Sequence, residues 1–334
     1  MKIDVVYTWV DGSDPVWENK RRLKADEIGK VLKESINQAL FSNNEELKYS
    51  LRSIDKFAPW INKVFIVTDN QIPKWLKIEN KKLQIIDHTE IFKNSSHLPT
   101  FNASAIETNL HHINDLSENF IYFNDDMFLG NICHPHFFYT SKGIPFIYTS
   151  EILPLPNKKA YNIKKRKKSK INYYQNAIVE TRKLLKNKLG LSTFINIRHS
   201  IKPLKKSLLY KLEELFKAEF NKTSNSNFRI DGDILPIHLF AFYSSVKKLG
   251  KLKYLITNDV KAKKFDLFSK FYKKFTFGFI NLHESDIEDH LDRILNAKPF
   301  TFCLNQTPET PPENLIKVKN FLEKYFPEKS QFEK

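Results

Sequence analysis

The chain reads Phe120-Ile121-Tyr122-Phe123-Asn124-Asp125-Asp126, an apolar run that stops on an amide and two carboxylates. A short apolar and aromatic run predicts a strand that is buried on both faces. Adjacent carboxylates at the end of such a strand repel each other and are costly to desolvate unless a cation lies between them. Oxygen ligands of this kind favour a divalent cation. The same three residues also suit a solvated turn, and the triplet alone does not decide.

Earlier runs predict the other strands of a sheet. Apolar, β-branched segments occupy Ile3 to Val10, Val64 to Val67 and Leu83 to Ile86. Segments of helical composition or spacing fall between the strands, at Val16 to Leu40, Glu45 to Phe57 and Ala103 to Leu116. Strands that alternate with helices and are apolar on both faces indicate a mainly parallel sheet. We therefore predict an α/β, Rossmann-like fold with helices on both faces of the sheet.

The second half of the chain is more basic and is predicted to be mainly helical. Amphipathic segments run from Asn172 to Leu189 and from Lys206 to Phe220, and an apolar one from Ile234 to Leu249. The composition changes near Pro154. We predict an α/β core over residues 1–153, a basic loop over 154–172 and a mainly helical part over 173–334.

Polar side chains follow each of the four predicted strands. Asp11 follows the first strand, Asp69 the second, Asp87 the third and Asn124 the fourth. Ligands of open α/β sheets bind outside the carboxyl ends of the strands. Four such ends concentrate carboxylates along one edge. A site for a metal and a phosphate group is therefore expected there.

Composition limits the class of protein. The 334 residues are 41% hydrophobic, enough for a sizeable core. No apolar run reaches the roughly eighteen residues of a bilayer span, and the first residues do not follow a signal-peptide pattern. We therefore expect a cytoplasmic protein, with a peripheral position at the inner face of the plasma membrane as a further expectation. Cys133 and Cys303 lack metal-ligand spacing and are interpreted as reduced structural thiols.

The formal charge of +16 predicts an anionic partner: nucleic acid, a membrane face or phosphorylated sugars. Basic residues are densest between Lys158 and Lys170. Such a cluster attracts anionic lipid, by about 1 kcal/mol for each basic residue near the surface. A solvated loop explains the cluster equally well.

Several individual residues have both a functional and a structural interpretation. Gly12, Asp14 and Pro15 suit a strand-to-helix turn, but Asp11 at the strand tip is not explained by it. Thr100 or Asn102 could cap the helix that follows, and a helix N-terminus also presents free amides to an anion.

Taken in order, these segments resemble the Stealth family of sugar-1-phosphate transferases, which includes bacterial capsule enzymes and the catalytic core of N-acetylglucosamine-1-phosphotransferase. The resemblance covers most of the chain. Its motifs are Ile3 to Pro15, Asn44 to Ile54, Ala58 to Trp60, Ile66 to Thr68, Ser96 to Asn102, Ala105 to Glu107, Tyr122 to Asp126, Arg198 to Ser200, Phe216 to Phe220, Phe228-Arg229 and Phe302 to Asn305. After Arg229 the family often has His-Ser-Glu-Asp, whereas this chain has Ile230-Asp231-Gly232-Asp233, which leaves open whether Asp231 or Asp233 takes the acidic role.

The resemblance implies transfer of a sugar-1-phosphate from a UDP-sugar to a hydroxyl of a glycan acceptor, with release of UMP and formation of a phosphodiester. Phosphoryl transfer depends mainly on positioning and charge neutralisation. The resemblance implies Asp125 and Asp126 as ligands of Mg²⁺ or Mn²⁺, His199 as base and Arg229 as the cation on a phosphoryl oxygen. It further implies Asp11 as a catalytic residue that positions the donor or the metal together with Arg52, and substrate contacts from Thr100, Asn102, Asn124 and Asn305. It also implies that residues 1–153 bind the nucleotide sugar and the metal and that residues 173–334 complete the same active site.

Two other functions compete with this expectation. A metal-dependent glycosyltransferase would also use acidic residues at a strand end, but it would release UDP. A nucleic-acid-binding protein would explain the charge, yet the basic residues lack interleaved aromatics and match no recognition motif. The resemblance implies a UDP-sugar donor and a glycan acceptor, and we expect no nucleic-acid partner. The basic surface has two candidate roles: contact with an anionic membrane, or binding of a glycan acceptor that is itself phosphate-linked.

Overall fold

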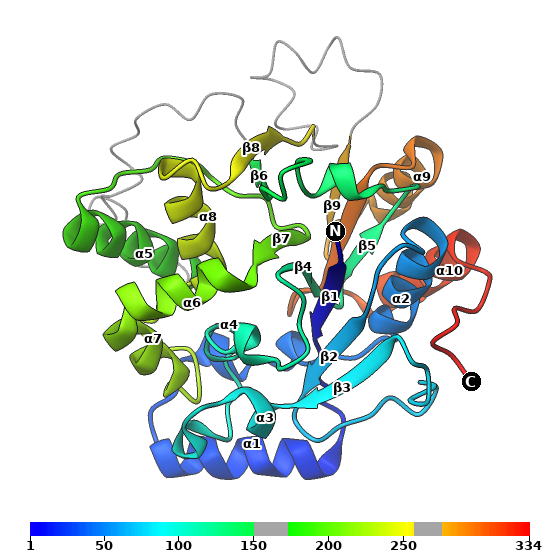
Figure 1. Ribbon diagram of the computed structural model, residues 1–334. Coiled ribbons are helices and arrows are strands. Elements are labelled where there is room, and N and C mark those ends of the chain that lie inside the picture. The colour runs from blue at the N-terminus through cyan, green and yellow to red at the C-terminus, as the bar shows by residue number, and fades with distance from the viewer. Residues whose placement is uncertain (150–172, 257–275) are drawn as a thin grey trace.

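The computed structural model describes residues 1–149, 173–256 and 276–334 (Figure 1). Its main sheet has five strands in the order β3-β2-β1-β4-β7. These strands are β1 (Ile3–Thr8), β2 (Val64–Thr68), β3 (Leu83–Asp87), β4 (Asn119–Asn124) and β7 (Lys202–Lys205). The first four are parallel, and β7 pairs with β4 in the antiparallel sense. The prediction of a mainly parallel α/β sheet is confirmed.

Of the four helices within residues 1–149, three correspond to predicted helical segments, and the one that directly follows β3 was not predicted. The four helices are α1 (Pro15–Ile28), α2 (Glu46–Phe57), α3 (His88–Ile91) and α4 (Ala103–Glu107), with 3-10 turns η1 (Lys33–Ile36), η2 (Gln38–Leu40), η3 (Ser95–His97) and η4 (Leu110–His112). Asp14 caps α1 and Pro15 begins it, as expected.

Two predicted helices were too long. α1 ends at Gly29, whose positive φ of 76° leaves the helical region. The helix expected from Ala103 to Leu116 stops at Glu107. Side chains of Thr108 and Asn109 bond the carbonyl oxygen of Ala105, so they compete with the helical backbone.

The second half contributes strands as well as helices. Its helices are α5 (Tyr173–Leu189), α6 (Lys206–Leu215), α7 (Lys217–Ser224), α8 (Pro236–Val246), α9 (Ile287–Ala297) and α10 (Pro312–Tyr325). Further strands are β8 (Lys251–Tyr254), β9 (Phe277–Asn281) and β10 (Thr301–Asn305). The single helix predicted from Lys206 to Phe220 is broken at Phe216, which leaves helical geometry while its ring is fully buried.

Two small sheets join distant parts of the chain. β5 (Met127–Leu129), which follows β4 directly, pairs with β10, and β10 pairs with β9. β6 (Phe146–Thr149) pairs with β8. A 3-10 turn, η5 (Pro135–Phe137), lies between β5 and β6. β5 directly follows the acidic triplet and pairs with β10. Residues of the C-terminal segment therefore lie beside that triplet.

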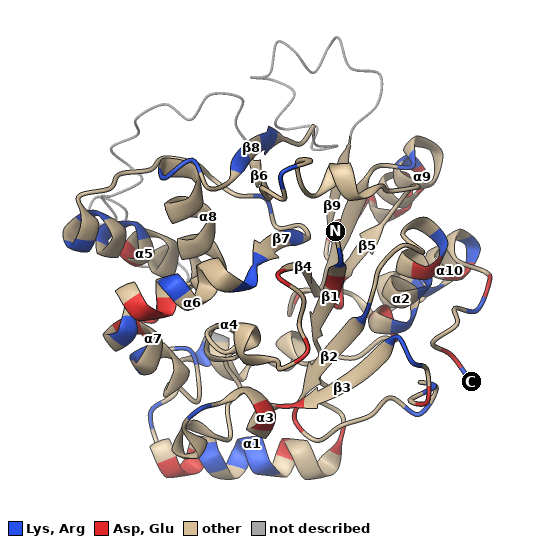
Figure 2. Cartoon of the chain, in the orientation of Figure 1, with Lys and Arg blue, Asp and Glu red and all other residues tan. Residues whose placement is uncertain are grey.

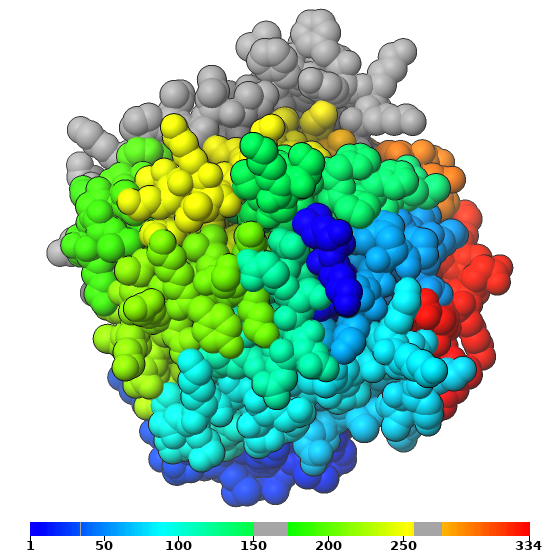
Figure 3. Space-filling model, viewed as in Figure 1, coloured from blue at the N-terminus to red at the C-terminus, as the bar shows by residue number. Residues whose placement is uncertain are grey.

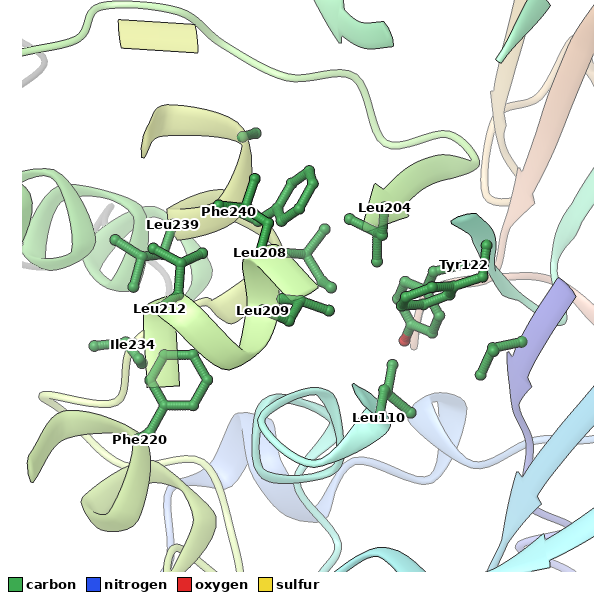
Figure 4. Close-up of a cluster of buried hydrophobic side chains, with 14 of the residues drawn as sticks. Leu110, Tyr122, Leu204, Leu208, Leu209, Leu212, Phe220, Ile234, Leu239 and Phe240 are labelled. Atoms are coloured by element: carbon green, nitrogen blue, oxygen red, sulfur yellow. The ribbon is translucent and has the colours of Figure 1, made fainter. Parts of the chain in front are cut away.

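The two halves share one core. Leu110 and Tyr122 from the first half belong to the same buried cluster as Leu204, Leu209 and Phe240 from the second (Figure 4). On the face shown in Figure 3, the yellow-green surface of α6 and α7 abuts the cyan surface around α3 and α4. The proposed division at residue 154 is not tested by this packing, and the predicted basic loop over 154–172 lies outside the described residues.

No helix within residues 1–149, 173–256 and 276–334 is long and apolar enough to cross a membrane.

Candidate active site

A pocket of about 660 Å³ lies at the carboxyl ends of the parallel strands. Its lining includes Trp9 after β1, Asp69 after β2, His88 after β3 and Asp125 after β4. The predicted convergence of four strand ends is therefore confirmed. Acidic segments are visible beside β4 and where β3 meets α3 (Figure 2). The loops that supply these side chains are aligned by the parallel register of the sheet.

The two aspartates of the opening segment occupy the turn between β4 and β5 and line this pocket. Burial raises the pKa of both carboxyl groups, and that of Asp126 rises to about 6. Asp126 Oδ2 accepts a hydrogen bond from Cys303 Sγ at 3.2 Å. Asp126 Oδ1 is buried and has no hydrogen-bond partner among the described residues. One oxygen of the site is therefore left for a ligand.

Glu46 adds a third carboxylate. It begins α2, is only 8% exposed, and lines the same pocket. Its oxygens accept hydrogen bonds from the backbone and side-chain amides of Asn44, at 2.6 and 2.7 Å. Burial raises the pKa of Glu46, and its charge in turn raises that of Asp125. Three carboxylates and one unpartnered oxygen fit a hard divalent cation.

Two nitrogen-bearing side chains line the pocket near these acids, His199 from the loop before β7 and Lys202 at the start of β7. His199 Nε2 lies 4.0 Å from Asp126 Oδ2. Burial, followed by the charge of Lys202, lowers the pKa of His199 to about 4, so the ring is neutral at neutral pH. The Lys202 ammonium donates to the carbonyl oxygens of Arg198, at 2.6 Å, and of Ser200. Burial lowers the pKa of Lys202 to about 7.

Arg229 lines the opposite part of the pocket, and its guanidinium carbon lies 5.7 Å from the Tyr173 ring centre. Asp233 holds this region together. Its buried carboxylate accepts hydrogen bonds from Ser226 Oγ at 2.7 Å, Asn102 Nδ2 at 2.9 Å and the Tyr173 hydroxyl at 3.1 Å. Asp231 is exposed and is bonded by Asn176. Asp233 therefore positions the loop around Arg229, and neither acid lines the pocket.

The pocket collects seven of the predicted site residues and leaves out three. The seven are Thr100, Asn124, Asp125, Asp126, His199, Arg229 and Asn305. Asp11 does not line the pocket, and its Oδ1 accepts a hydrogen bond from Ser13 while its Oδ2 accepts one from Asn43, in the segment before α2. Asn102 is buried, caps α4 and bonds Asp233.

The placement of Arg52 corrects an expectation. It was expected to position the donor or the metal, but it does not line the pocket. Its guanidinium forms a bidentate ion pair with Glu333, at 2.8 and 2.7 Å, and donates to the carbonyl oxygen of Phe326. These contacts hold the C-terminal segment against α2, which gives Arg52 a structural role.

Among the pocket residues not identified as site residues from the sequence are Glu46, Glu107, Lys202 and His238. Burial raises the pKa of Glu107 to about 7. Glu107 lies within the motif Ala105 to Glu107, which carries the family resemblance, so this motif could have identified it as a site residue. Cys303, interpreted as a structural thiol, instead donates to Asp126 and lies within a group of possible metal ligands with Asp126 and His199. Cys303 likewise stands within the Phe302 to Asn305 motif, whereas no local pattern marks Lys202.

Three family models match the chain. They describe conserved regions 1, 2 and 3 of Stealth proteins and cover residues 1–23, 40–147 and 198–244. An exopolysaccharide phosphotransferase of Streptomyces coelicolor is 34% identical over 99% of this chain and 57% of its own length. The exopolysaccharide phosphotransferase CpsY of Mycobacterium tuberculosis is 33% identical over 99% of this chain and 58% of its own. The chain thus spans little more than half the length of these relatives.

Among solved structures, the galactosyltransferase LgtC, crystallised with donor and acceptor sugar analogues, is similar with a TM-score of 0.43 and 11% identity. The similarity covers 96% of this chain and 95% of that one.

Proposed function

The chain belongs to the Stealth family, and from that premise we propose that it transfers a sugar-1-phosphate from a UDP-sugar to a hydroxyl of a glycan acceptor. The oxygen of the acceptor forms a bond to the phosphorus next to the sugar, and the bond from that phosphorus to UMP breaks. The sugar C1–O bond stays intact, and the product is a phosphodiester in a cell-surface polysaccharide. The names of the curated relatives support this reaction class.

The observation that carries the proposal is the buried acidic cluster with its unpartnered oxygen, Asp126 Oδ1. Asp125 and Asp126 would hold Mg²⁺ or Mn²⁺, and Glu46 lies close enough to add to the negative potential. A divalent ion bound there would neutralise charge on the two phosphates of the donor. Cys303 donates to Oδ2 of Asp126, which leaves Oδ1 directed to the ligand.

Other side chains of the pocket supply the remaining chemistry. His199, whose Nε2 lies 4.0 Å from Asp126 Oδ2, would accept the proton of the attacking hydroxyl. Arg229 and Lys202 would neutralise phosphoryl oxygens. The hydroxyl group of Thr100 and the side-chain amides of Asn124 and Asn305 would form hydrogen bonds with the UDP-sugar.

Product analysis tests this reaction. The protein is incubated with a panel of UDP-sugars, Mg²⁺ and glycan acceptors, with Asp126→Asn as a matched control for the metal site. Release of UMP that depends on Asp126 is the expected result. Release of UDP would instead identify a metal-dependent glycosyltransferase. Failure to turn over any nucleotide sugar, together with DNA binding that weakens steeply with salt, would favour a nucleic-acid-binding protein.

The positive charge supports two further parts of the proposal: a phosphate-linked acceptor and peripheral contact with an anionic membrane. The basic cluster from Lys164 to Lys168 is the segment to change for the second, although it lies outside the described residues. Replacing these residues by Ser should move the protein off anionic liposomes. Unchanged partitioning would remove the membrane contact and leave the transferase proposal intact.

A further inference from the structure

A second cluster of ligating side chains lies away from the pocket. His111 and His112 on η4 direct their Nε2 atoms at Oε2 of Glu213 on α6, at 2.9 and 3.1 Å. The three ligand atoms lie within 4.8 Å of one another, and none of these residues lines the pocket. His111 is fully buried, and the side chains of His112 and Glu213 are 8% and 22% exposed. The cluster is therefore built into the packing between two elements.

The hydrogen bond on the far side of His112 fixes what its Nε2 atom can do. Nδ1 lies 2.9 Å from the carbonyl oxygen of Ile91, which can only accept, so Nδ1 carries the hydrogen. In the neutral ring, Nε2 then presents a lone pair to the Glu213 carboxylate. Two acceptors 3.1 Å apart repel each other, so a proton or a metal cation must lie between them. A backbone carbonyl on the far nitrogen is the usual support of a metal-ligating histidine.

The spacing of the ligand atoms suits a metal. Tetrahedral zinc bonds of ~2.0–2.1 Å place neighbouring ligand atoms about 3.3 Å apart. The two measured separations from Glu213 Oε2, 2.9 and 3.1 Å, are close to that edge length. The Tyr210 ring packs against both imidazoles, with centroid distances of 4.6 and 5.7 Å. His111 Nδ1 has no partner among the described residues, and this holds with or without a cation.

Lys93 is the competing cation. Its ammonium lies 2.8 Å from Oε1 of Glu213 and 3.0 Å from Oε2. Its side chain is 61% exposed, so it can stay on Oε1 or move into solvent. Oε2 then remains available to an ion between the two histidines.

We propose that His111, His112 and Glu213 form a binding site for a zinc-class transition-metal cation, with water in the remaining position. The ion ties η4 to α6, at an interface where Leu110 of η4 and Leu209 of α6 share one buried cluster (Figure 4). This site is structural. It is separate from the hard-cation site of the pocket and does not depend on the proposed reaction.

Metal titration tests the site directly. The chelator-treated full chain, with excess Mg²⁺ present, is titrated with Zn²⁺ against a competing chelator, and with Co²⁺ by visible absorption. We expect one equivalent of Zn²⁺ and a tetrahedral Co²⁺ spectrum. His112→Gln and Glu213→Gln should each weaken the binding of this Zn²⁺ ion. The loss of affinity should exceed the roughly 10–100-fold that follows loss of a supporting hydrogen bond. Circular dichroism confirms that each variant is folded.

Matched histidine variants locate the ion. His199→Gln in the pocket and His290→Gln, in a third group with Glu284 and Asp286, should retain the same equivalent. Lys93→Gln should tighten binding several-fold because it removes the competing ammonium. If the wild type binds no Zn²⁺ under these conditions, or if His112→Gln binds it as tightly as the wild type, a proton bridges the cluster and the proposal is overturned.

Discussion

Helix α2 contributes one side chain to each of two buried charged clusters, and only one of these clusters is balanced. Arg52 meets Glu333 in a bidentate ion pair, and a backbone carbonyl takes a further donor. Glu46, also on α2, lies near Asp125 and Asp126, whose pKa values are raised first by burial and then by the charge of Glu46. A buried charge is retained cheaply only when it is paired and hydrogen-bonded. The Arg52–Glu333 pair therefore stabilises the fold without a ligand, whereas the cluster of Glu46, Asp125 and Asp126 requires a bound cation to offset its negative charge.

Of the variants considered, Asp126→Asn should have the largest effect, because it removes a carboxylate that would hold the metal in the acidic pocket cluster. We expect sugar-phosphate transfer to fall by at least about a thousandfold, since charge neutralisation at the phosphates dominates this chemistry. The free energy of unfolding should not fall at neutral pH, because the variant removes a buried charge that is disfavoured there. UMP release and urea unfolding measure the two quantities. Wild-type turnover in the variant would take Asp126 out of the site.

Arg52→Met makes the opposite test on the balanced cluster. Leaving Glu333 buried without its partner should cost about 3–5 kcal/mol of stability. Urea unfolding of the single variant is compared with that of Arg52→Met/Glu333→Leu, which should recover most of the loss. A single variant within 1 kcal/mol of the wild type would show that the pair contributes as little as an exposed one.

The acidic cluster shows how far the sequence alone leads. The four strand ends could be predicted because apolar runs that stop on polar residues are a local pattern, and a parallel sheet brings their ends to one edge. The N-terminus of α1 was predictable for the same reason, from Asp14 and Pro15. Arg52 was assigned to the site from its motif, and its real partner, Glu333, is too distant in sequence to be recognised.

Other parts of the pocket depend on tertiary packing. β7 reads Lys-Pro-Leu-Lys, which lacks strand alternation, and a proline is tolerated there because β7 is the edge of the sheet. That pairing brings Lys202 beside Tyr122 of β4. Cys303 reaches Asp126 only because β10 pairs with β5, whose register places Cys303 opposite Met127. No short-range signal in the sequence encodes either contact.

Glu107→Gln tests whether a buried pocket carboxylate makes the stability of the protein depend on pH. Burial raises the pKa of Glu107 from 4.5 to about 7, so the folded protein binds this proton more tightly than the unfolded chain does. Stability from this group is then present below pH ~4.5 and is lost as the pH rises through about 7. The variant should therefore be more stable than the wild type at pH 8, by on the order of 1–3 kcal/mol, with the difference shrinking towards pH 5. Thermal unfolding across this range checks the sign, and a gain that is independent of pH would contradict it.

Cys303 should have the smallest effect. Its variants test whether the hydrogen bond from its thiol orients Asp126 for metal binding. Its thiol donates to Asp126 Oδ2 at 3.2 Å, and burial raises the pKa of the thiol, so the donor is protonated at neutral pH. Cys303→Ala removes that donor and should weaken Mg²⁺ or Mn²⁺ binding by about tenfold, the lower end for loss of a supporting hydrogen bond. Cys303→Ser keeps a donor in the same place and should stay close to the wild type. Metal titration of the three proteins is the measurement. Equal affinities in all three would return Cys303 to the structural role expected from the sequence, because its hydrogen bond would then have no effect on the oxygen left free at Asp126.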